Sequence, residues 1–235
     1  MARVRRDLSP FLVHLTRDYE GTSAEDNLAS ILKTAVIEAR NPYGIAIRHL
    51  EQIAVTDEVA LTTQQVACFS ETPPDDLHGL VSPGIWRRYK FRPYGLAFDR
   101  EHMLYHGVNP VWYLNSYQGT HDWLAHQVNA LIDDIAVSKK SLHGAEAFAA
   151  SNIARLTPYI EVIGEWGAKK KDFTFEREWR HVGDFHFEIG DVAAIITPPG
   201  EGRDLRKTLV TRWGKDLIAH IEFRELTEDS ATSGA

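Results

Sequence analysis

Two glutamates one residue apart, Glu176 and Glu178, stand within the aromatic and arginine-rich stretch FTFEREWR. If residues 173–180 form a strand, the two glutamates share one face, with their Cα atoms about 7 Å apart. Two carboxylates on one wall of a cleft can stabilise developing positive charge and orient a hydroxyl group. The same pattern is also typical of a solvated strand face, whose Glu–Arg pairs contribute little to stability. The opposite face of this strand is predicted to carry Phe173, Phe175, Arg177 and Trp179 toward a core.

A second group of polar side chains lies near the N-terminus, in the stretch FLVHLTR. An alternating strand over this stretch places His14 and Thr16 on one face. The segment GTSAEDNLASILKTAVIEA then predicts a helix that Thr22 or Ser23 can cap, and Ser23 with Asp26 approximates a capping box. The apolar stripe of this helix is predicted to consist of Leu28, Ile31, Leu32, Ala35 and Val36.

Short strands and two helices are predicted for the middle of the chain. QQVACFSETPPDDL indicates a buried strand that stops at Pro73 and Pro74, because prolines cannot continue a central ladder. YGLAFDRE predicts a second strand that leads into a short helix, and NPVWYLNS predicts a third strand. Helices follow at about 121–139 and 143–157. The first of them is expected to pack in the core rather than bind a partner, with an inner face of Trp123, Leu124, Val128, Leu131, Ile132 and Ile135.

The C-terminal third returns to strands, in IEVIG, DFTFEREWRHVG, DFHFEI, DVAAIITP and LIAHIEFREL, with one more helix at 204–214. These patterns predict an α+β fold with one domain over residues 1–225 and a helical insertion at about 120–157. The small polar residues at 226–235 predict a disordered tail.

Composition limits the class of protein. The chain has 235 residues, one cysteine (Cys68) and a formal net charge of −7. The single cysteine excludes an internal disulfide, and the negative charge argues against broad electrostatic capture of nucleic acid. No apolar run approaches the roughly 18 residues that a membrane span needs. We therefore expect a cytoplasmic protein that does not insert into membranes.

Histidines spaced for metal binding occur once, at His102 and His106. Residues four apart share a helix face, as zinc ligands do, but two histidines without a third ligand do not make a site. The sequence also contains no Walker-type loop and no Gly-x-Gly-x-x-Gly loop after a strand. We expect no bound metal, and the kinase and Rossmann classes are not favoured.

The N-terminal elements resemble the opening of the ADP-ribosyltransferase fold. In the poly(ADP-ribose) polymerase branch a strand carries His-Gly-Ser/Thr-Arg, and the following helix carries Asn and Ile-Leu. Leu15 replaces the glycine of the strand, and Ala35 stands where the family usually has glycine after the helix. DarT-type DNA ADP-ribosyltransferases open in a similar way. The residues that match are His14, Thr16 and Arg17 on the strand and Asn27, Leu28, Ile31 and Leu32 on the helix.

The remainder of the chain resembles bacterial abortive-infection proteins of the AbiGi type. Four segments carry this resemblance, and their order along the chain is more specific than any one of them. The fold implied is an ADP-ribosyltransferase-like pair of small antiparallel or mixed β-sheets with flanking helices. The segments are CFSE at 68–71, YGLAF at 94–98, GVNPVWY at 107–113 and FEREWR at 175–180.

The resemblance implies a site for NAD as a substrate. His14 would bind the adenine-side ribose, and Thr16 would help position the nicotinamide half. Arg17 and Ser70 would supply the arginine and serine of the branch whose signature ends in Glu-x-Glu.

The same resemblance implies roles for two aromatic residues and the two glutamates. Phe69 or Tyr94 would stack on the nicotinamide ring. Glu178 would grip the nicotinamide-ribose hydroxyl and stabilise the oxocarbenium-like cation, while Glu176 would orient or deprotonate the acceptor.

Two functions follow from the resemblance. The first is an NAD-dependent ADP-ribosyltransferase in phage defence or a toxin–antitoxin system, which modifies a nucleic acid or protein acceptor and has a neutralising partner protein. The second is a catalytically inactive family member that acts as an antitoxin or binding subunit.

Overall fold

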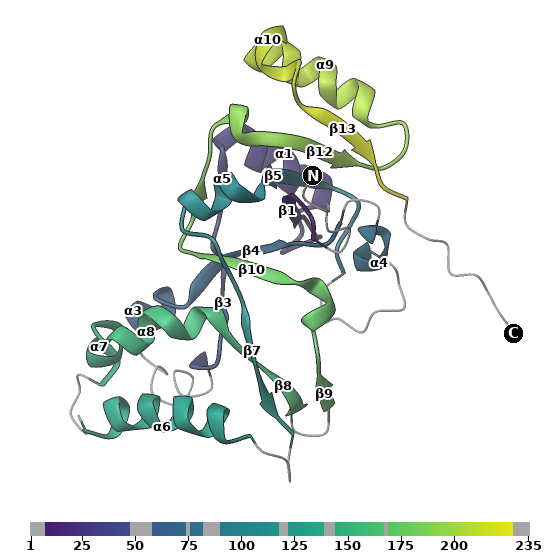
Figure 1. The fold of residues 1–235 in the computed structure, drawn as a ribbon. Helices are drawn as coiled ribbons and strands as arrows, with labels where there is room; N and C mark the ends of the chain where they lie inside the picture. The colour runs from purple at the N-terminus through teal and green to yellow at the C-terminus, as the bar shows by residue number, and fades with distance from the viewer. Residues whose placement is uncertain are drawn as a thin grey trace, which may run out of the picture. The chain divides into compact units, whose positions relative to one another are not determined.

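The structure is a computed structural model that describes residues 8–47, 58–73, 76–81, 90–117, 122–138, 144–166 and 169–227 (Figure 1). Its contacts divide the chain into two compact units. Unit 1 contains residues 1–36, 69–107 and 186–235, and unit 2 contains residues 37–68 and 108–185. The mixed α+β class with several sheets is confirmed. The single domain expected over 1–225 stays a prediction, and so does an ADP-ribosyltransferase-like arrangement.

Unit 1 is built on a sheet in the order β13-β12-β5-β1, continuing to the end of β4. Strand β1 pairs antiparallel with β5 over five residues, from Phe11 opposite Asp99 to Leu15 opposite Gly95. Strand β12 pairs antiparallel with the other side of β5, and β13 pairs parallel with β12. The bounds are β1 Phe11–Leu15, β5 Gly95–Asp99, β12 Val192–Thr197 and β13 Glu222–Glu225.

Helix α1 (Ala24–Thr34) confirms the predicted cap, because Ser23 is its N-cap and accepts a hydrogen bond from the amide of Asp26 at 3.1 Å. The predicted stripe is wrong at its end. The helix stops at Thr34, and Ala35 adopts the left-handed conformation with φ 55°. This conformation favours glycine, which lacks the Cβ clash. Val36 then starts strand β2 (Val36–Ile37).

The other helices of unit 1 flank the sheet, and α9 packs against β12 and β13 (Figure 1). Aliphatic side chains of β1, β5 and β12 form the core with residues of α4. The bounds are α4 His78–Val81, α5 Arg100–Tyr105, η4 Ile189–Asp191, α9 Gly202–Trp213 and α10 Lys215–Ile218. The core residues are Val13, Leu15, Leu77, Leu80, Val81, Ala97, Ala194, Ile196 and Leu226.

Unit 2 contains the start of β4 with β10, β6 and β3, and a separate sheet in the order β7-β8-β9. Strand β7 pairs parallel with β8, and β9 returns antiparallel. Strands β2, β4 and β11 each run across the unit boundary. The bounds are β3 Asn41–Pro42, β4 Gln65–Ser70, β6 Asn109–Pro110, β7 Trp112–Ser116, β8 Ile160–Trp166, β9 Lys169–Lys171, β10 Glu178–Val182 and β11 Phe185–His186.

Helix α6 (Trp123–Ser138) confirms the first predicted helix of the middle region and contacts β7 (Figure 1). The second predicted helix is divided by a turn into α7 (Gly144–Ala149) and α8 (Asn152–Leu156). Ser151 causes the division, because it is the N-cap of α8 and its hydroxyl accepts from the amide of Ala154. The remaining elements are α3 Glu58–Thr62, η2 Thr157–Tyr159 and η3 Thr174–Glu176.

The predicted inner face of α6 is half wrong. Ile132 is fully buried and packs with Phe148, as expected. Trp123, Leu124 and Leu131 are instead 65%, 44% and 53% exposed. The helix is apolar on two sides, and its sequence alone does not show which side the core covers.

None of the described helices is long and apolar enough to cross a membrane. Part of the C-terminal tail and Pro74 and Asp75 lie outside the described residues, so the tail's predicted disorder and the predicted stop at Pro74 stay predictions. The predicted helix at 204–214 is confirmed by α9, which begins two residues earlier.

Candidate functional site

The stretch FTFEREWR does not form a strand over its whole length. Thr174–Glu176 forms the 3-10 turn η3, Arg177 has φ 48°, and strand β10 begins only at Glu178. Asp172 starts the turn, because its carboxylate accepts from both the amide and the hydroxyl of Thr174, at 3.1 and 2.7 Å. The two glutamates therefore do not share a strand face, and the predicted alternation of side chains from Phe173 to Arg177 is wrong.

The alternation does hold from Glu178 onward. Arg180, two residues along β10, donates from Nε and Nη2 to the two carboxylate oxygens of Glu178 at 2.9 and 3.0 Å. This is the bidentate geometry in which a guanidinium holds a carboxylate most firmly. The side chain of Arg180 is 1% exposed and that of Glu178 is 13% exposed. Both oxygens of the candidate catalytic carboxylate are thus occupied by a buried cation of the same unit.

Arg180 is the centre of a larger buried network. Its Nη2 also donates to Glu161 at 3.2 Å, its Nη1 donates to the carbonyl of Pro158, and its guanidinium lies over the ring of Tyr43 at 5.2 Å. Lys171 donates to the other oxygen of Glu161 at 2.7 Å. Two carboxylates therefore face two cations, so the network is neutral as a whole.

The neighbouring charges, rather than burial, set the direction of the pKa shifts of Arg180 and Glu161. Burial works against the charged form of Arg180, but Glu178 and Glu161 outweigh it and raise the pKa of the guanidinium. Burial likewise tends to raise the pKa of Glu161, while Arg180 and Lys171 bring that pKa below its ordinary value. Arg180 and Glu161 are consequently both ionised at neutral pH.

Two weak acids border Glu178. Desolvation raises the pKa of the Cys68 thiol well above its usual value, and the Glu178 carboxylate adds to this effect. Desolvation also raises the pKa of Tyr113, whose hydroxyl donates to Glu178 at 3.3 Å. Cys68 is therefore held as a neutral thiol, as expected for an inert cysteine.

The sequence interpretation missed Glu161, the second carboxylate of the network. It lies in the apolar strand segment IEVIG and is 5% exposed. A lone carboxylate in an apolar run is a signal of a buried ion pair, since an unpaired buried charge is too costly. The partner, Arg180, could not be assigned from the spacing of the two residues.

The NAD-binding residues proposed from the resemblance fall in unit 1, whereas Glu176 and Glu178 fall in unit 2. His14 and Phe69 meet ring to ring, with centroids 5.9 Å apart in an edge-to-face arrangement. Thr16 is 3% exposed, and its hydroxyl donates to the carbonyl oxygens of Ala24 and Tyr94 at 2.8 and 3.2 Å. This threonine fixes the start of α1 to the strand region.

Arg17 and Ser70 make local contacts in unit 1. The guanidinium of Arg17 lies over the ring of Tyr19 at 5.5 Å, and its carbonyl accepts from Asn27 at 3.0 Å. Ser70 pairs with β1 opposite Val13, and its hydroxyl is 2.7 Å from that of Thr72. Asn27, the first residue of the matched helix motif, thus holds α1 to the residue that follows Thr16.

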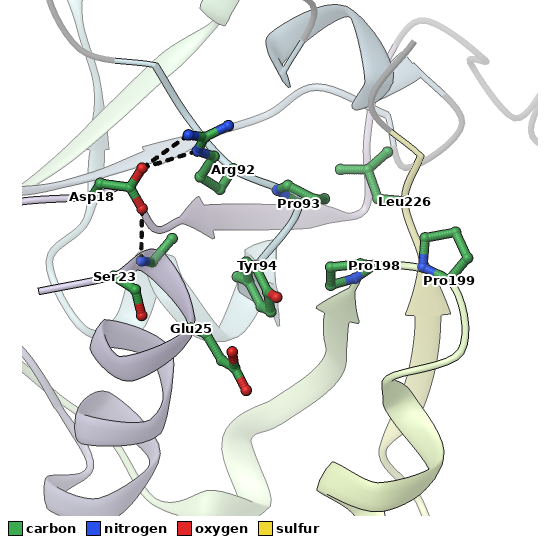
Figure 2. Close-up of a pocket in the computed structure, with 10 residues that line it drawn as sticks. Asp18, Ser23, Glu25, Arg92, Pro93, Tyr94, Pro198, Pro199 and Leu226 are labelled. Atoms are coloured by element: carbon green, nitrogen blue, oxygen red, sulfur yellow. Dashed lines mark hydrogen bonds and ion pairs between the residues drawn. The ribbon is translucent and has the colours of Figure 1, made fainter. Parts of the chain in front are cut away.

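An open pocket of about 440 Å³ lies in unit 1 beside the first turn of α1 (Figure 2). Tyr94 lines it and donates its hydroxyl to Glu201 at 2.8 Å. At another side, Asp18 accepts from the amide of Ala24 and from Arg92, both at 3.0 Å (Figure 2). Prolines line much of the rest, namely Pro93, Pro198 and Pro199.

The charge of this pocket is mostly negative. The Ala24 amide and the Arg92 side chain together lower the pKa of Asp18. Glu25 also lines the pocket, so one cation faces two carboxylates. Of the residues proposed for NAD, Tyr94 is in the lining, while His14 contacts the ring of Phe69.

The ring of His102 on α5 lies beside the ring of His106, the C-cap residue of that helix, with centroids 4.4 Å apart. His102 also approaches Asp191 at 3.2 Å. Within the described part of the chain, no group of three or more His, Cys, Asp or Glu side chains is placed to hold a metal ion.

Comparison with protein families gives a match over most of the chain. A family model with the description "Putative abortive phage resistance protein AbiGi, antitoxin" matches residues 29–203. The match includes β4, β5, the buried network and α6. The comparison with curated proteins and the comparison with solved structures each gave no match.

Proposed function

Because the chain belongs to the AbiGi family of abortive phage resistance proteins, which is described as an antitoxin, we propose that it is the antitoxin of a phage-defence system and acts by binding a partner toxin. The observation that carries this proposal is the family match over residues 29–203. An antitoxin that acts by binding needs a stable surface rather than a reacting group, so this function makes no demand on Glu176 or Glu178.

The state of Glu178 supports a binding role. A carboxylate that stabilises an oxocarbenium-like cation must present uncompensated negative charge to it. Both oxygens of Glu178 are instead held by Arg180, within a network of two carboxylates and two cations. Structural ion-pair networks also shift pKa values, so the shifts of Arg180 and Glu161 do not by themselves mark a catalytic site.

The second candidate function is NAD-dependent ADP-ribosyl transfer to a nucleic acid or protein acceptor. It is favoured by the edge-to-face contact of His14 with Phe69 and by the position of Tyr94 in an open pocket. In this function NAD would be the substrate, Glu178 would bind the nicotinamide-ribose hydroxyl, and Glu176 would act on the acceptor.

Expression in bacterial cells tests the antitoxin proposal. The chain is expressed alone and together with each protein encoded next to its gene. We expect no growth arrest from the chain alone, arrest from one neighbouring protein alone, and recovery when the two are expressed together. Growth arrest by the chain alone would overturn the antitoxin proposal and favour the toxin.

Incubation with labelled NAD separates the second candidate. The purified chain, with and without a cell lysate, is followed for release of nicotinamide and transfer of label. The antitoxin proposal predicts neither. Turnover that is lost in Glu178→Gln and retained in Glu222→Gln, a change of a partly exposed glutamate on β13, would establish the transferase instead.

A further inference from the structure

The outer side of helix α6 in unit 2 is the surface that we consider for binding a partner. The inner side is already covered, because Ala125 and Ile132 are 4% and 0% exposed and pack in the core with Phe148. On the outer side, Trp123 and Leu131 are 65% and 53% exposed. A helix that is apolar on two sides is normally covered on both. The core of unit 2 covers only one of them.

The exposed apolar residues form one patch rather than scattered positions. Leu124 and Leu131 are seven residues apart, so they lie nearly in line, two turns apart on the helix. Trp123 is about 80° around the helix from Leu131, at 100° per residue, and the exposed Gln127 lies between them. These four residues, with the exposed Asp134 one turn beyond Leu131, are called the α6 outer face.

The composition of this patch matches the centre of a protein interface. Tryptophan, like tyrosine and arginine, is enriched among the few residues that supply most of the binding free energy at interfaces. Single exposed apolar side chains need no explanation, but contiguous ones indicate an interaction site. Trp123 is the anchor that this face offers.

The charge around the patch selects the kind of partner. Residues 122–138 contain Asp122, Asp133 and Asp134 and no lysine or arginine. Asp133 and Asp134 are exposed at the C-terminal end, and Asp122 pairs with His126 at 3.1 Å. An acidic helix is repelled by nucleic acid and by anionic lipid surfaces. It attracts a protein surface with lysines or arginines around an apolar centre.

We propose that the α6 outer face docks a basic, apolar-centred surface of the partner toxin, with Trp123 and Leu131 as the central contacts and Asp134 as the charged rim. This inference rests on the proposed antitoxin function and names the surface that performs it. A second copy of the chain is a less suitable occupant, because it would set two acidic helices against each other.

The first test uses the full-length chain and a synthetic probe. The probe is a helical peptide with leucines on one side and lysines around them, and its control has glutamates in place of the lysines. We expect the lysine peptide to bind wild type, with Trp123→Ala and Leu131→Ser each weakening binding by about tenfold or more. Asp134→Lys should weaken it at low salt only, since added salt screens exposed charges. The glutamate peptide should not bind.

Matched controls separate docking from folding. Leu217 on α10 of unit 1 is 44% exposed, against 53% for Leu131, so Leu217→Ser removes a comparably exposed leucine elsewhere. This variant should bind the peptide as wild type does. All variants should keep the melting temperature of wild type, because the changed side chains are at the surface. Equal loss of binding in Leu217→Ser would overturn the proposal.

The second test repeats the toxin-neutralisation experiment with the same variants. We expect Trp123→Ala and Leu131→Ser to fail to neutralise the toxin, and Leu217→Ser to succeed. If both α6 variants neutralise as wild type does, the docking surface is overturned while the antitoxin function stands. If the wild-type chain does not neutralise the toxin, the antitoxin function fails. Peptide binding alone then tests whether the α6 outer face is a docking surface. A wild-type dimer that becomes a monomer in Leu131→Ser would assign the face to a second copy and overturn the proposal.

Discussion

Unit 1 packs aliphatic side chains of β1, β5 and β12 in its core and keeps its Asp18–Arg92 ion pair at the surface, where the two side chains are 55% and 42% exposed. Unit 2 has an apolar core of its own, but it differs in where its main ion-pair network and one helix face lie. It buries Arg180 against two carboxylates and leaves Trp123 and Leu131 exposed. Buried charge fixes one arrangement of the strands around it, and exposed apolar surface offers binding free energy to a partner. On the docking proposal above, the exposed side of α6 is the surface that unit 2 presents to a partner.

Removal of the buried arginine is the largest test of this contrast. Arg180→Leu leaves Glu178 and Glu161 in place without their shared cation, and should lower the free energy of unfolding by about 3 to 5 kcal/mol. Arg92→Leu breaks the exposed pair of unit 1 and should cost no more than about 1 kcal/mol. Urea denaturation measures both. Equal losses of unfolding free energy in the two variants would show that the buried network of unit 2 stabilises the fold no more than the exposed pair of unit 1.

Close packing at Gly44 gives the next largest effect. Gly44 of unit 2 has φ 107°, and a Cβ there would collide with the carbonyl of Thr157. Gly21 of unit 1 has φ 84° with nothing within 4 Å of the same position. Gly21→Ala should therefore cost about 1 kcal/mol from the backbone alone, and Gly44→Ala about 3 kcal/mol or more. The loss of unfolding free energy in Gly44→Ala minus that in Gly21→Ala measures the cost of the collision with Thr157. A difference near zero would contradict the collision.

Acid should destabilise unit 2 through Glu161. Its folded pKa lies below the ordinary value of 4.5, so its contribution is complete above that pH and is lost as the pH falls through the folded pKa. Glu161→Gln removes this dependence. Asp18→Asn should change the pH profile little, because Asp18 is solvated although its pKa is also lowered, by the Ala24 amide and Arg92. Unfolding free energies measured at several pH values test both. Unchanged acid sensitivity in Glu161→Gln would exclude Glu161 as its source.

A glycine at position 35 should produce the smallest effect, and a favourable one. Ala35 of unit 1 has φ 55°, which costs a residue with a Cβ about 1 kcal/mol. Ala35→Gly should raise the melting temperature by a few degrees on this account. Ala29→Gly, at an exposed position inside the same helix, should lower it, because glycine weakens a helix interior. A lower melting temperature in Ala35→Gly would show that other contacts hold the turn.

Local signals in the sequence were sufficient for the elements that begin and end on nearby residues. Ser23 and Asp26 are three apart, and their cap locates the start of α1 without reference to the rest of the chain. The strands β1 and β5 follow from alternation and turn residues. The ordered motifs also identified the family to which the chain belongs.

The interpretation of FTFEREWR needed the tertiary structure. Asp172 binds Thr174 and turns the chain before the strand, which delays β10 to Glu178. Arg180 then takes its second carboxylate from Glu161, 19 residues earlier. No local pattern encodes such a partner, because side chains from different strands meet only when the strands are folded together.

What the sequence by itself determined is the start of α1, the strands β1 and β5, the helix α6 and the family to which the chain belongs. It placed Trp123, Leu131 and Ile132 on one amphipathic helix. Only the tertiary structure decided that Ile132 enters the core and that Trp123 and Leu131 remain exposed. The physical reason is that hydrophobic periodicity gives the direction of each side chain around a helix axis, whereas burial depends on which neighbouring elements pack against each direction.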